Sequence, residues 1–444
     1  MQPYHLTLAP TPISSATRVA QRAWLPSCTR FSMISLRQML IVVSLLCSGG
    51  MVERTIATEV ILPALGGPEA ITLSLQHEAH AALDRAYAWL LAQQHPKGHW
   101  SNPNFPALSG LAVWALVRGG EENQEAIERG VDFILSCAHD NGAIFVEPTA
   151  QRRGGGLSNY NTAISMVALN EVGRADLIPY VLRAREFIAA SQLLSPDSLY
   201  HGGMGYDAAT DRAYTDLSNS YIAFEAMRLT EQAEDFRTSG ERADLDWAAA
   251  LQFVQRVHNH PEYNDRPWVS DAERDVGGFV YHPEQTRAGT FTDADGIVRF
   301  RSMPGMTYAG MLSYIYAGVD RHDPRVQATV DWAVRHWNLE ANNPVTDGDT
   351  HHDTTDEREG LFYFYNVLSK GMAAFGQDEF HPTDRPAFNW RTELAEKLIA
   401  LQRIAPATGH GYWVNEVGRY WESDPVLVTA YAVLALQMAL GDQR

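Results

Sequence analysis

Residues 88–116 read AWLLAQQHPKGHWSNPNFPALSGLAVWAL, and they contain one copy of the unit that decides the fold. A helical segment centred on an aromatic residue, 88–91, is followed by the Gly-containing turn 97–100 and by a second apolar helix near Ser109. This order recurs about six times along the chain, at intervals of roughly 45 to 80 residues. Units that are helical throughout cannot bury their apolar faces singly, so they must stack on one another.

The repeats can be followed to the end of the chain. The first helices include residues 88–91, 132–135, 186–188, 252–254, 331–334 and 397–399. The second helices are predicted to begin near Ser109, Asn159, Ser218, Met306, Gly360 and Asp424. A Gly-containing turn separates the two helices in every unit except the fifth, where the polar stretch 342–359 replaces it. Glycine permits a positive φ at such a turn, and the aromatic residue beside it can fold back over the helix end.

The two helices of each unit differ in composition. The first carries apolar residues at helical spacing on one side, whereas the second, as in residues 425–440, is apolar all round and should be buried on every side. An open solenoid needs polar capping repeats, and the last repeat is not polar. The sequence therefore predicts an all-α fold, an α6/α6 toroid of about six helix-pair repeats with the apolar helices inside.

The chain has 444 residues and a formal net charge of −18. This charge argues against binding to nucleic acid, which requires a basic face, and against electrostatic docking on anionic lipid. No stable protein partner is evident. With Cys28 and Cys47 in an N-terminal region that we expect to be removed, Cys137 is left as a lone thiol, so no intrachain disulfide is expected.

The N-terminal region divides from the repeats. Residues 1–32 lack periodicity and are predicted to be disordered. Alternatively, they are an over-extended start of the coding sequence, and translation begins at Met33. Residues 33–57 combine Arg37, a short apolar run and small residues, as in a secretory signal peptide. Residues 58–76 are interpreted as a linker and 77–444 as the toroid domain. We expect export to the periplasm or exterior; the alternative is an uncleaved membrane anchor.

Two spacings carry a resemblance to a known family. Gln93, Gly98 and Trp100, and again Gln402, Gly411 and Trp413, resemble the Gln/Trp repeat of the prenyltransferase and squalene-cyclase family. That family contains terpenoid cyclases and protein prenyltransferase β subunits. The resemblance implies an α/α toroid whose central cavity binds or converts an isoprenoid.

In such a ring, all turns from first to second helix open at one end, which we call the mouth. The N-termini of the second helices surround it, and their partial positive charge favours an anion. Arg152, Arg153 and Arg301 are predicted to lie there, together with Arg299, and to bind a diphosphate. The alternative is that these arginines pair with neighbouring acids such as Asp293.

The densest polar cluster, residues 347–357, precedes the second helix that begins near Gly360. Carboxylates this close raise one another's pKa, which suits a general acid. Squalene-type cyclases use an Asp-x-Asp-Asp motif for this purpose, and the chain matches it until Thr350 stands at the last position. The alternative is a solvated acidic loop. The predicted catalytic residues are Asp349, Asp353 and Asp356, followed by Asp216 and Glu422.

Asp216 and Glu422 are included because Ser218 and Ser423 are expected to cap the neighbouring helices and leave both carboxylates free. Other residues of the mouth are expected either to contact the ligand or to serve as helix caps and core. The predicted ligand-binding residues of this kind are Asn159, Asn219, Tyr308, Tyr363, Trp413 and Trp421.

Zinc prenyltransferases hold their metal with Asp, Cys and His. Asn366 stands where the resemblance would place the His, and no Cys lies in the corresponding turn. We therefore predict no bound metal and no cofactor.

Three functions remain open. The first is a terpene cyclase- or prenyltransferase-like protein that acts on or binds an apolar isoprenoid; an acid beside an empty apolar cavity would favour it. The second is an exported carbohydrate-active hydrolase or lyase; an open polar cleft with two carboxylates about 5 to 10 Å apart would favour that. The third is a non-catalytic binding scaffold, which a cavity filled by side chains would favour.

Overall fold

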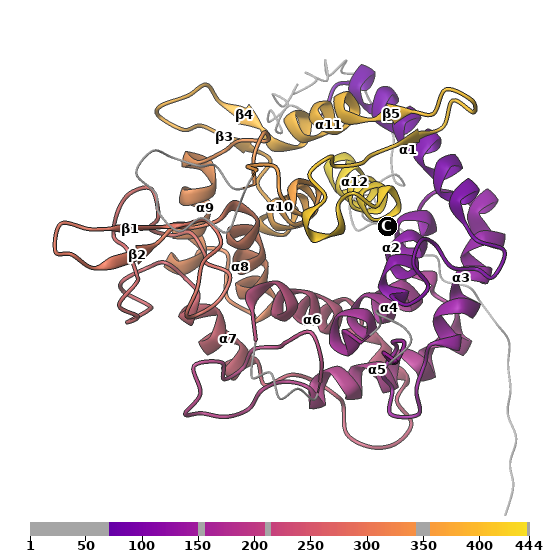
Figure 1. The fold of residues 1–444 in the computed structure, drawn as a ribbon, viewed down its shortest axis with the longest axis horizontal. Helices are drawn as coiled ribbons and strands as arrows, with labels where there is room; N and C mark the ends of the chain where they lie inside the picture. Colours follow the sequence, from indigo (N-terminus) through magenta and orange to yellow (C-terminus); the bar gives the residue numbers. More distant parts are fainter. Residues whose placement is uncertain (1–70, 150–155, 209–214, 343–355, 442–444) are drawn as a thin grey trace, which may run out of the picture. The chain divides into compact units, whose positions relative to one another are not determined.

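Alternate helices form the inner wall and the outer layer of a ring (Figure 1). The computed structural model describes residues 71–149, 156–208, 215–342 and 356–441, which belong to one unit, Ala64–Arg444. The predicted disordered start 1–32 and signal peptide 33–57 lie outside the described residues. Within them, no helix is both long and apolar enough to cross a membrane.

The inner helices are the apolar ones. They are α2 (Pro106–Val117), α4 (Ser158–Val172), α6 (Leu217–Leu229), α8 (Pro304–Tyr316), α10 (Leu361–Phe375) and α12 (Pro425–Leu440). Each begins within three residues of its predicted start. The outer helices are α1 (Leu73–Gln93), α3 (Gln124–Ser136), α5 (Ile178–Ala190), α7 (Trp247–Arg256), α9 (Pro324–Arg335) and α11 (Trp390–Leu401).

Short elements decorate the connections between these helices. The 3-10 helices are η1 (Glu121–Asn123), η2 (Ala175–Leu177), η3 (Glu231–Phe236) and η4 (Arg419–Trp421). Three antiparallel strand pairs are described: β1 (Thr290–Thr292) with β2 (Val298–Phe300), β3 (Glu379–Phe380) with β4 (Phe388–Asn389), and β5 (Arg403–Ile404) with β6 (Gly411–Tyr412).

Burial explains which helices lie inside. α12 buries 13 of its 16 residues, whereas α3 buries 5 of its 13. A helix that is apolar on all sides lowers its free energy most when it is surrounded by other helices, and an amphipathic one when it covers them. The expected division into inner and outer helices is confirmed.

The ring is closed by contacts between the two ends of the described chain. Each inner helix packs against the next, from α2 through α12, and α12 packs against α2. The outer helix α1 contacts both α11 and α12. The prediction that the last unit lies beside the first is therefore confirmed.

The turns between outer and inner helices share one construction. The indole of Trp100 donates to the carbonyl of Leu90 at 2.7 Å, and that of Trp413 to Leu398 at 2.8 Å, so each ring folds back over its outer helix as predicted. A backbone N–H of each turn donates to a Ser or Thr hydroxyl of the inner helix. These pairs are Trp100–Ser109, Ile144–Thr162, Met204–Ser220, Phe279–Thr307 and Trp413–Thr429.

Glutamines at the ends of outer helices tie neighbouring units together. The amide of Gln94 donates to the carbonyls of Gly98 and Ala126, at 2.9 and 2.8 Å. Gln402 repeats this bond to Ala82 of α1 at 2.8 Å, across the closure of the ring. The repeat glutamine of the first unit is thus Gln94 and not Gln93, because the C-cap residue of α1 makes this bond, as Gln402, the C-cap of α11, does.

Candidate functional site

A cavity of about 290 Å³ lies where the inner helices begin. Pockets for small molecules usually measure about 300 to 1,000 Å³, so this one is of a size to hold a compact ligand. All six inner helices contribute to its lining near their N-terminal ends. Representative lining residues are Leu108, Tyr160, Ile222, Met306, Tyr363 and Tyr431.

Six of the described lining residues are tyrosines. The hydroxyls of Tyr160 and Tyr431 lie 3.2 Å apart and hydrogen bond across the ring from α4 to α12. The ring of Tyr363 lies edge-on to that of Tyr431, with centroids 6.3 Å apart. No described residue hydrogen bonds with the buried hydroxyl of Tyr363. The cavity thus presents aromatic faces to a ligand.

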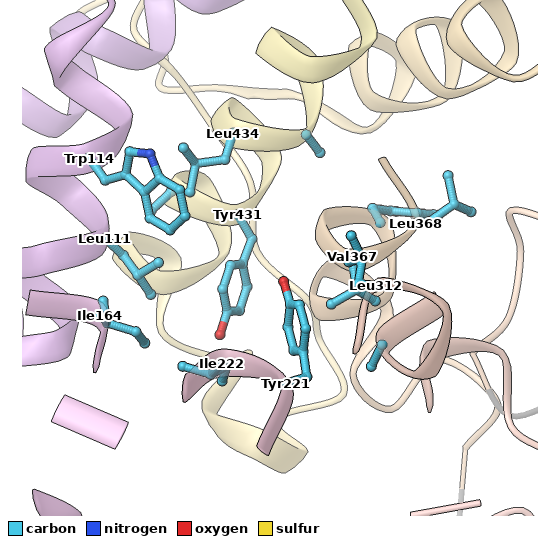
Figure 2. Packing of buried hydrophobic residues seen from close by; sticks show 14 of the residues in the cluster. Leu111, Trp114, Ile164, Tyr221, Ile222, Leu312, Val367, Leu368, Tyr431 and Leu434 are labelled. Atoms are coloured by element: carbon cyan, nitrogen blue, oxygen red, sulfur yellow. The ribbon is translucent and has the colours of Figure 1, made fainter. Parts of the chain in front are cut away.

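Buried side chains of the inner helices pack together inside the ring, and Figure 2 shows some of them, among them Trp114, Tyr221 and Leu368. Trp114 lies one turn beyond the lining residue Leu111, and Glu225 lies one turn beyond Ile222. Glu225 on α6 pairs with Lys370 on α10, with 3.0 Å between Oε2 and Nζ.

This buried ion pair has further partners. Tyr221 and Tyr316 donate to the Glu225 carboxylate at 3.2 and 3.3 Å. The ammonium of Lys370 lies 4.3 Å from the ring centre of Trp114, as in a cation–π contact.

Asp216 lies beside the cavity at the N-terminus of α6 and is fully buried. Its Oδ1 accepts from the hydroxyl of Ser218 at 2.6 Å and from the backbone N–H of Asn219 at 2.9 Å. A further hydrogen bond joins it to the side chain of Tyr281, which lines the cavity. Burial raises the pKa of Asp216, although these hydrogen bonds act in the opposite direction.

Glu422 is also fully buried, and it caps a helix that it does not belong to. Its Oε1 accepts from the backbone N–H of Tyr363 at 2.8 Å, and its Oε2 from the amide of Asn415 at 2.7 Å. The N-cap of α10, Gly360, has no side chain to do this. Burial raises the pKa of Glu422 to about 7.

The expectation that neighbouring serines free these two carboxylates from capping is therefore wrong. Asp216 is itself the N-cap of α6, and Ser218 donates to it. Ser423 does not cap α12, because Asp424 accepts from the N–H of Val426. The cause of the raised pKa values also differs, since burial rather than crowding by other carboxylates is the largest contribution.

The pKa of Glu422 predicts a pH-dependent stability. The unfolded chain releases this proton near pH 4.5 and the folded protein near pH 7. Between these values the folded state binds the extra proton, so its stability falls as pH rises. At about 1.36 kcal/mol per pKa unit, the loss amounts to about 3 kcal/mol. Glu422→Gln removes the titration, so the variant should gain this amount relative to wild type between pH 4.5 and 7.

Urea denaturation of both proteins across this pH range measures the difference, and other titrating groups cancel in it. Glu122→Gln changes an exposed carboxylate and is the matched control, whose difference from wild type should stay flat. A flat difference for Glu422→Gln as well would contradict the raised pKa.

The remaining predicted acids differ from these two. Asp356 pairs with Arg358 at 2.9 Å, and this contact lowers the pKa of Asp356. An acid held in its ionised form does not fit the general-acid role expected for it. Asp349 and Asp353 lie outside the described residues, as do Arg152 and Arg153.

The predicted ligand-binding residues fall into two groups. Tyr363 and Trp421 line the cavity. Arg301 is paired with Asp275 at 2.7 Å, in line with the alternative that these arginines bind neighbouring acids. Trp413 is fully buried against its outer helix.

Three more predicted residues are buried by protein neighbours. Tyr308 of α8 packs near Phe364, with ring centroids 5.9 Å apart. Asn159 donates to the carbonyl of Gly205 at 3.0 Å, and Asn219 to the Asp216 carboxylate at 2.7 Å. These three and Arg301 and Trp413 are not among the lining residues of the cavity.

Several lining residues were not predicted. Arg287 is the one charged residue of the described lining, and its guanidinium lies 4.6 Å from the ring centre of Tyr281. Tyr206 and Tyr281 both line the cavity, and each ends a Gly-rich turn of consecutive units. The equivalent positions of Tyr206 and Tyr281 in the repeat could have identified both as lining residues. Arg287 lies in a loop without a motif, so the sequence held no such signal for it.

Side chains that could bind a metal are dispersed in the described part of the chain. Across 71–149, 156–208, 215–342 and 356–441, no three His, Cys, Asp or Glu side chains are grouped as a metal site. The lining tyrosines and Arg287 supply hydrogen-bond donors and a cation, which suit an organic ligand.

Comparisons with known proteins concern the fold. No protein-family model matches the chain, and no curated protein matches it in sequence. A crystal structure of D-mannose isomerase is similar over 85% of this chain and 100% of its own, at 12% identity and a TM-score of 0.51. Cellobiose 2-epimerase from Spirochaeta thermophila is similar over 84% and 99%, at 12% identity and a TM-score of 0.50.

A type II terpene cyclase from Scytonema, in complex with geranylgeranyl dihydroxybenzoate, is similar over 83% of this chain and 99% of its own. The identity is 13% and the TM-score 0.45. With its closed inner wall of helices and these neighbours, the chain has an α/α-toroid fold.

Proposed function

We propose that the chain binds an apolar, isoprenoid-type ligand in the cavity at the mouth of the ring. The observation that carries this proposal is the lining: apolar and aromatic side chains from every inner helix, with Arg287 the one charged member among the described residues. Burying an apolar chain there removes its surface from water, which stabilises the complex by about 25 cal/mol per Å² of apolar surface buried. We also propose that the helix pairs of the ring are six repeats of one unit.

The lining does not favour the carbohydrate-active alternative. Glycoside hydrolysis uses two carboxylates that flank the scissile bond, and the described lining contains no Asp or Glu. It does not favour a merely structural ring either, because a cavity of about 290 Å³ lies between the described lining residues.

If the ligand is converted as well as bound, we propose Asp216 as the proton donor. Its raised pKa favours the protonated form, and its hydrogen bond to Tyr281 joins it to a hydroxyl on the cavity wall. General acids act through such short hydrogen-bonded routes. Glu422 is the second candidate, although its carboxylate is occupied by the N-terminus of α10.

The experiment is a calorimetric titration with farnesol, followed by analysis of the incubated ligand for products. For a ligand enclosed mainly by apolar contacts, we expect a dissociation constant in the micromolar range. This corresponds to a binding free energy of about −8 kcal/mol. Ala107→Phe places a ring in the cavity from its α2 wall and should weaken binding at least tenfold.

Ala81→Phe is the matched control, because Ala81 is exposed on the outer helix α1. This variant should bind farnesol as wild type does. Binding of cellobiose but not of farnesol by wild type would reject the proposal. Product formation that is lost in Asp216→Asn would support the proposed proton donor, because Asn caps a helix as well as Asp does.

A further inference from the structure

Backbone strain is concentrated at the rim of the cavity. Among the described residues, the non-glycine positions with positive φ are Ser101, Leu157, Tyr420 and Trp421, at 49°, 52°, 57° and 68°. Leu157, Tyr420 and Trp421 line the cavity, and the hydroxyl of Ser101 hydrogen bonds with Asp424, the N-cap of α12. L-residues avoid this region because Cβ approaches the following carbonyl, so such strain persists only where the surrounding structure enforces it.

The two adjacent aromatic residues, like Tyr206, are exposed members of the lining. Tyr420 and Trp421 are 41% and 46% exposed, whereas most of the other lining residues are buried or half-buried. Trp421 meets the ring of Phe105 edge-on, with centroids 4.4 Å apart. Large exposed rings at the entrance of an apolar cavity leave apolar surface in water until a ligand covers it.

The segment that carries these rings is held firmly on both sides. Arg419 pairs with the buried Glu359 at 2.9 Å, and Glu422 accepts from the N–H of Tyr363 at 2.8 Å. The N–H of Asp424 donates to the carbonyl of Trp421 at 2.8 Å. The anchors fix the backbone of Tyr420 and Trp421 in its strained form and direct the two rings over the cavity.

We propose that Tyr420 and Trp421 form a preorganised aromatic clamp, which covers the bound apolar ligand and contributes to its affinity and selection. This inference rests on the proposed function and assigns the binding contacts at the rim. A clamp built into the folded state loses little conformational entropy when the ligand binds, which raises the affinity.

Trp421→Gly tests the clamp, since glycine removes the ring and also adopts the positive φ without strain. The farnesol dissociation constant should rise about tenfold or more, the equivalent of one buried aromatic contact. The melting temperature of the free protein should not fall, because relief of strain offsets the lost contact with Phe105. Trp421→Phe, which keeps a ring, should remain within about threefold of the wild-type affinity.

Ser101→Gly is the matched control, because it relieves a positive φ of the same kind at a residue outside the lining. This variant should leave farnesol affinity unchanged. Wild-type affinity in Trp421→Gly would overturn the clamp and leave the proposed function standing. A large fall in melting temperature together with lost binding would assign Trp421 a structural role and also overturn the clamp. Absence of farnesol binding by the wild-type protein would overturn the proposed function and the clamp together.

Discussion

Glu225→Ala is expected to lower the free energy of unfolding by about 3–5 kcal/mol. Glu225 and Lys370 are 5% and 7% exposed, so water solvates neither charge well. Removal of the carboxylate leaves the ammonium of Lys370 buried with the ring of Trp114 as a partner, and the hydroxyls of Tyr221 and Tyr316 lose their acceptor. Urea denaturation, followed by far-ultraviolet circular dichroism, measures the change in midpoint and slope.

Two controls separate the lost charge partner from the lost volume. In the double variant Glu225→Gln and Lys370→Met, no charge is left buried, and much of the stability should return, because paired charges are often replaceable by neutral residues. Glu416→Ala breaks the exposed pair with Arg403 and should leave the midpoint almost unchanged, because water screens that pair. A midpoint for Glu225→Ala as close to wild type as that of Glu416→Ala would contradict the prediction.

The helices could be predicted because their signal is local. Periodicity places each inner helix start within three residues, and the largely apolar composition of residues 425–440 gives α12 its inside position. The closure of the ring was predicted because the last repeat is not polar, as the capping repeat of an open solenoid would be. The bond from Gln402 to Ala82 that joins the ends connects residues more than 300 positions apart, so no local pattern could specify it.

The functional residues were harder to predict because their roles depend on distant partners. Glu422 looked like a surplus carboxylate, yet it caps α10 through Tyr363, which lies 59 residues away. Trp413 matches the repeat signature, and that match gives it a packing role against Leu398 rather than a place on the cavity wall. Trp421 does line the cavity, but its strained backbone could be found only in the structure.

The second large effect on stability is expected for Gly202→Ala, in one of the Gly-containing turns of the repeats. Gly202 has φ +90°, and a Cβ built there would lie 1.8 Å from the carbonyl oxygen of Ala249 in α7. The backbone of one unit's turn thus rests on the outer helix of the next unit, as Gly98 rests on the carbonyl of Arg129. Neither backbone can move without separating the two units. The side-chain amide of Gln192 also joins them, because it donates to the carbonyls of Gly202 and of Asp246, the N-cap of α7.

We expect Gly202→Ala to cost about 4 kcal/mol, the sum of a strained backbone and an overpacked contact. Gly240→Ala is the matched control, because Gly240 has φ +81° and a Cβ added there would meet no described atom within 4 Å. That variant should lose only about 1–2 kcal/mol, the backbone strain alone. Denaturation of both variants gives the difference, which measures the close approach between units. Equal losses would mean that the units are not held together at the glycine turns, because only the backbone conformation would then oppose a side chain there.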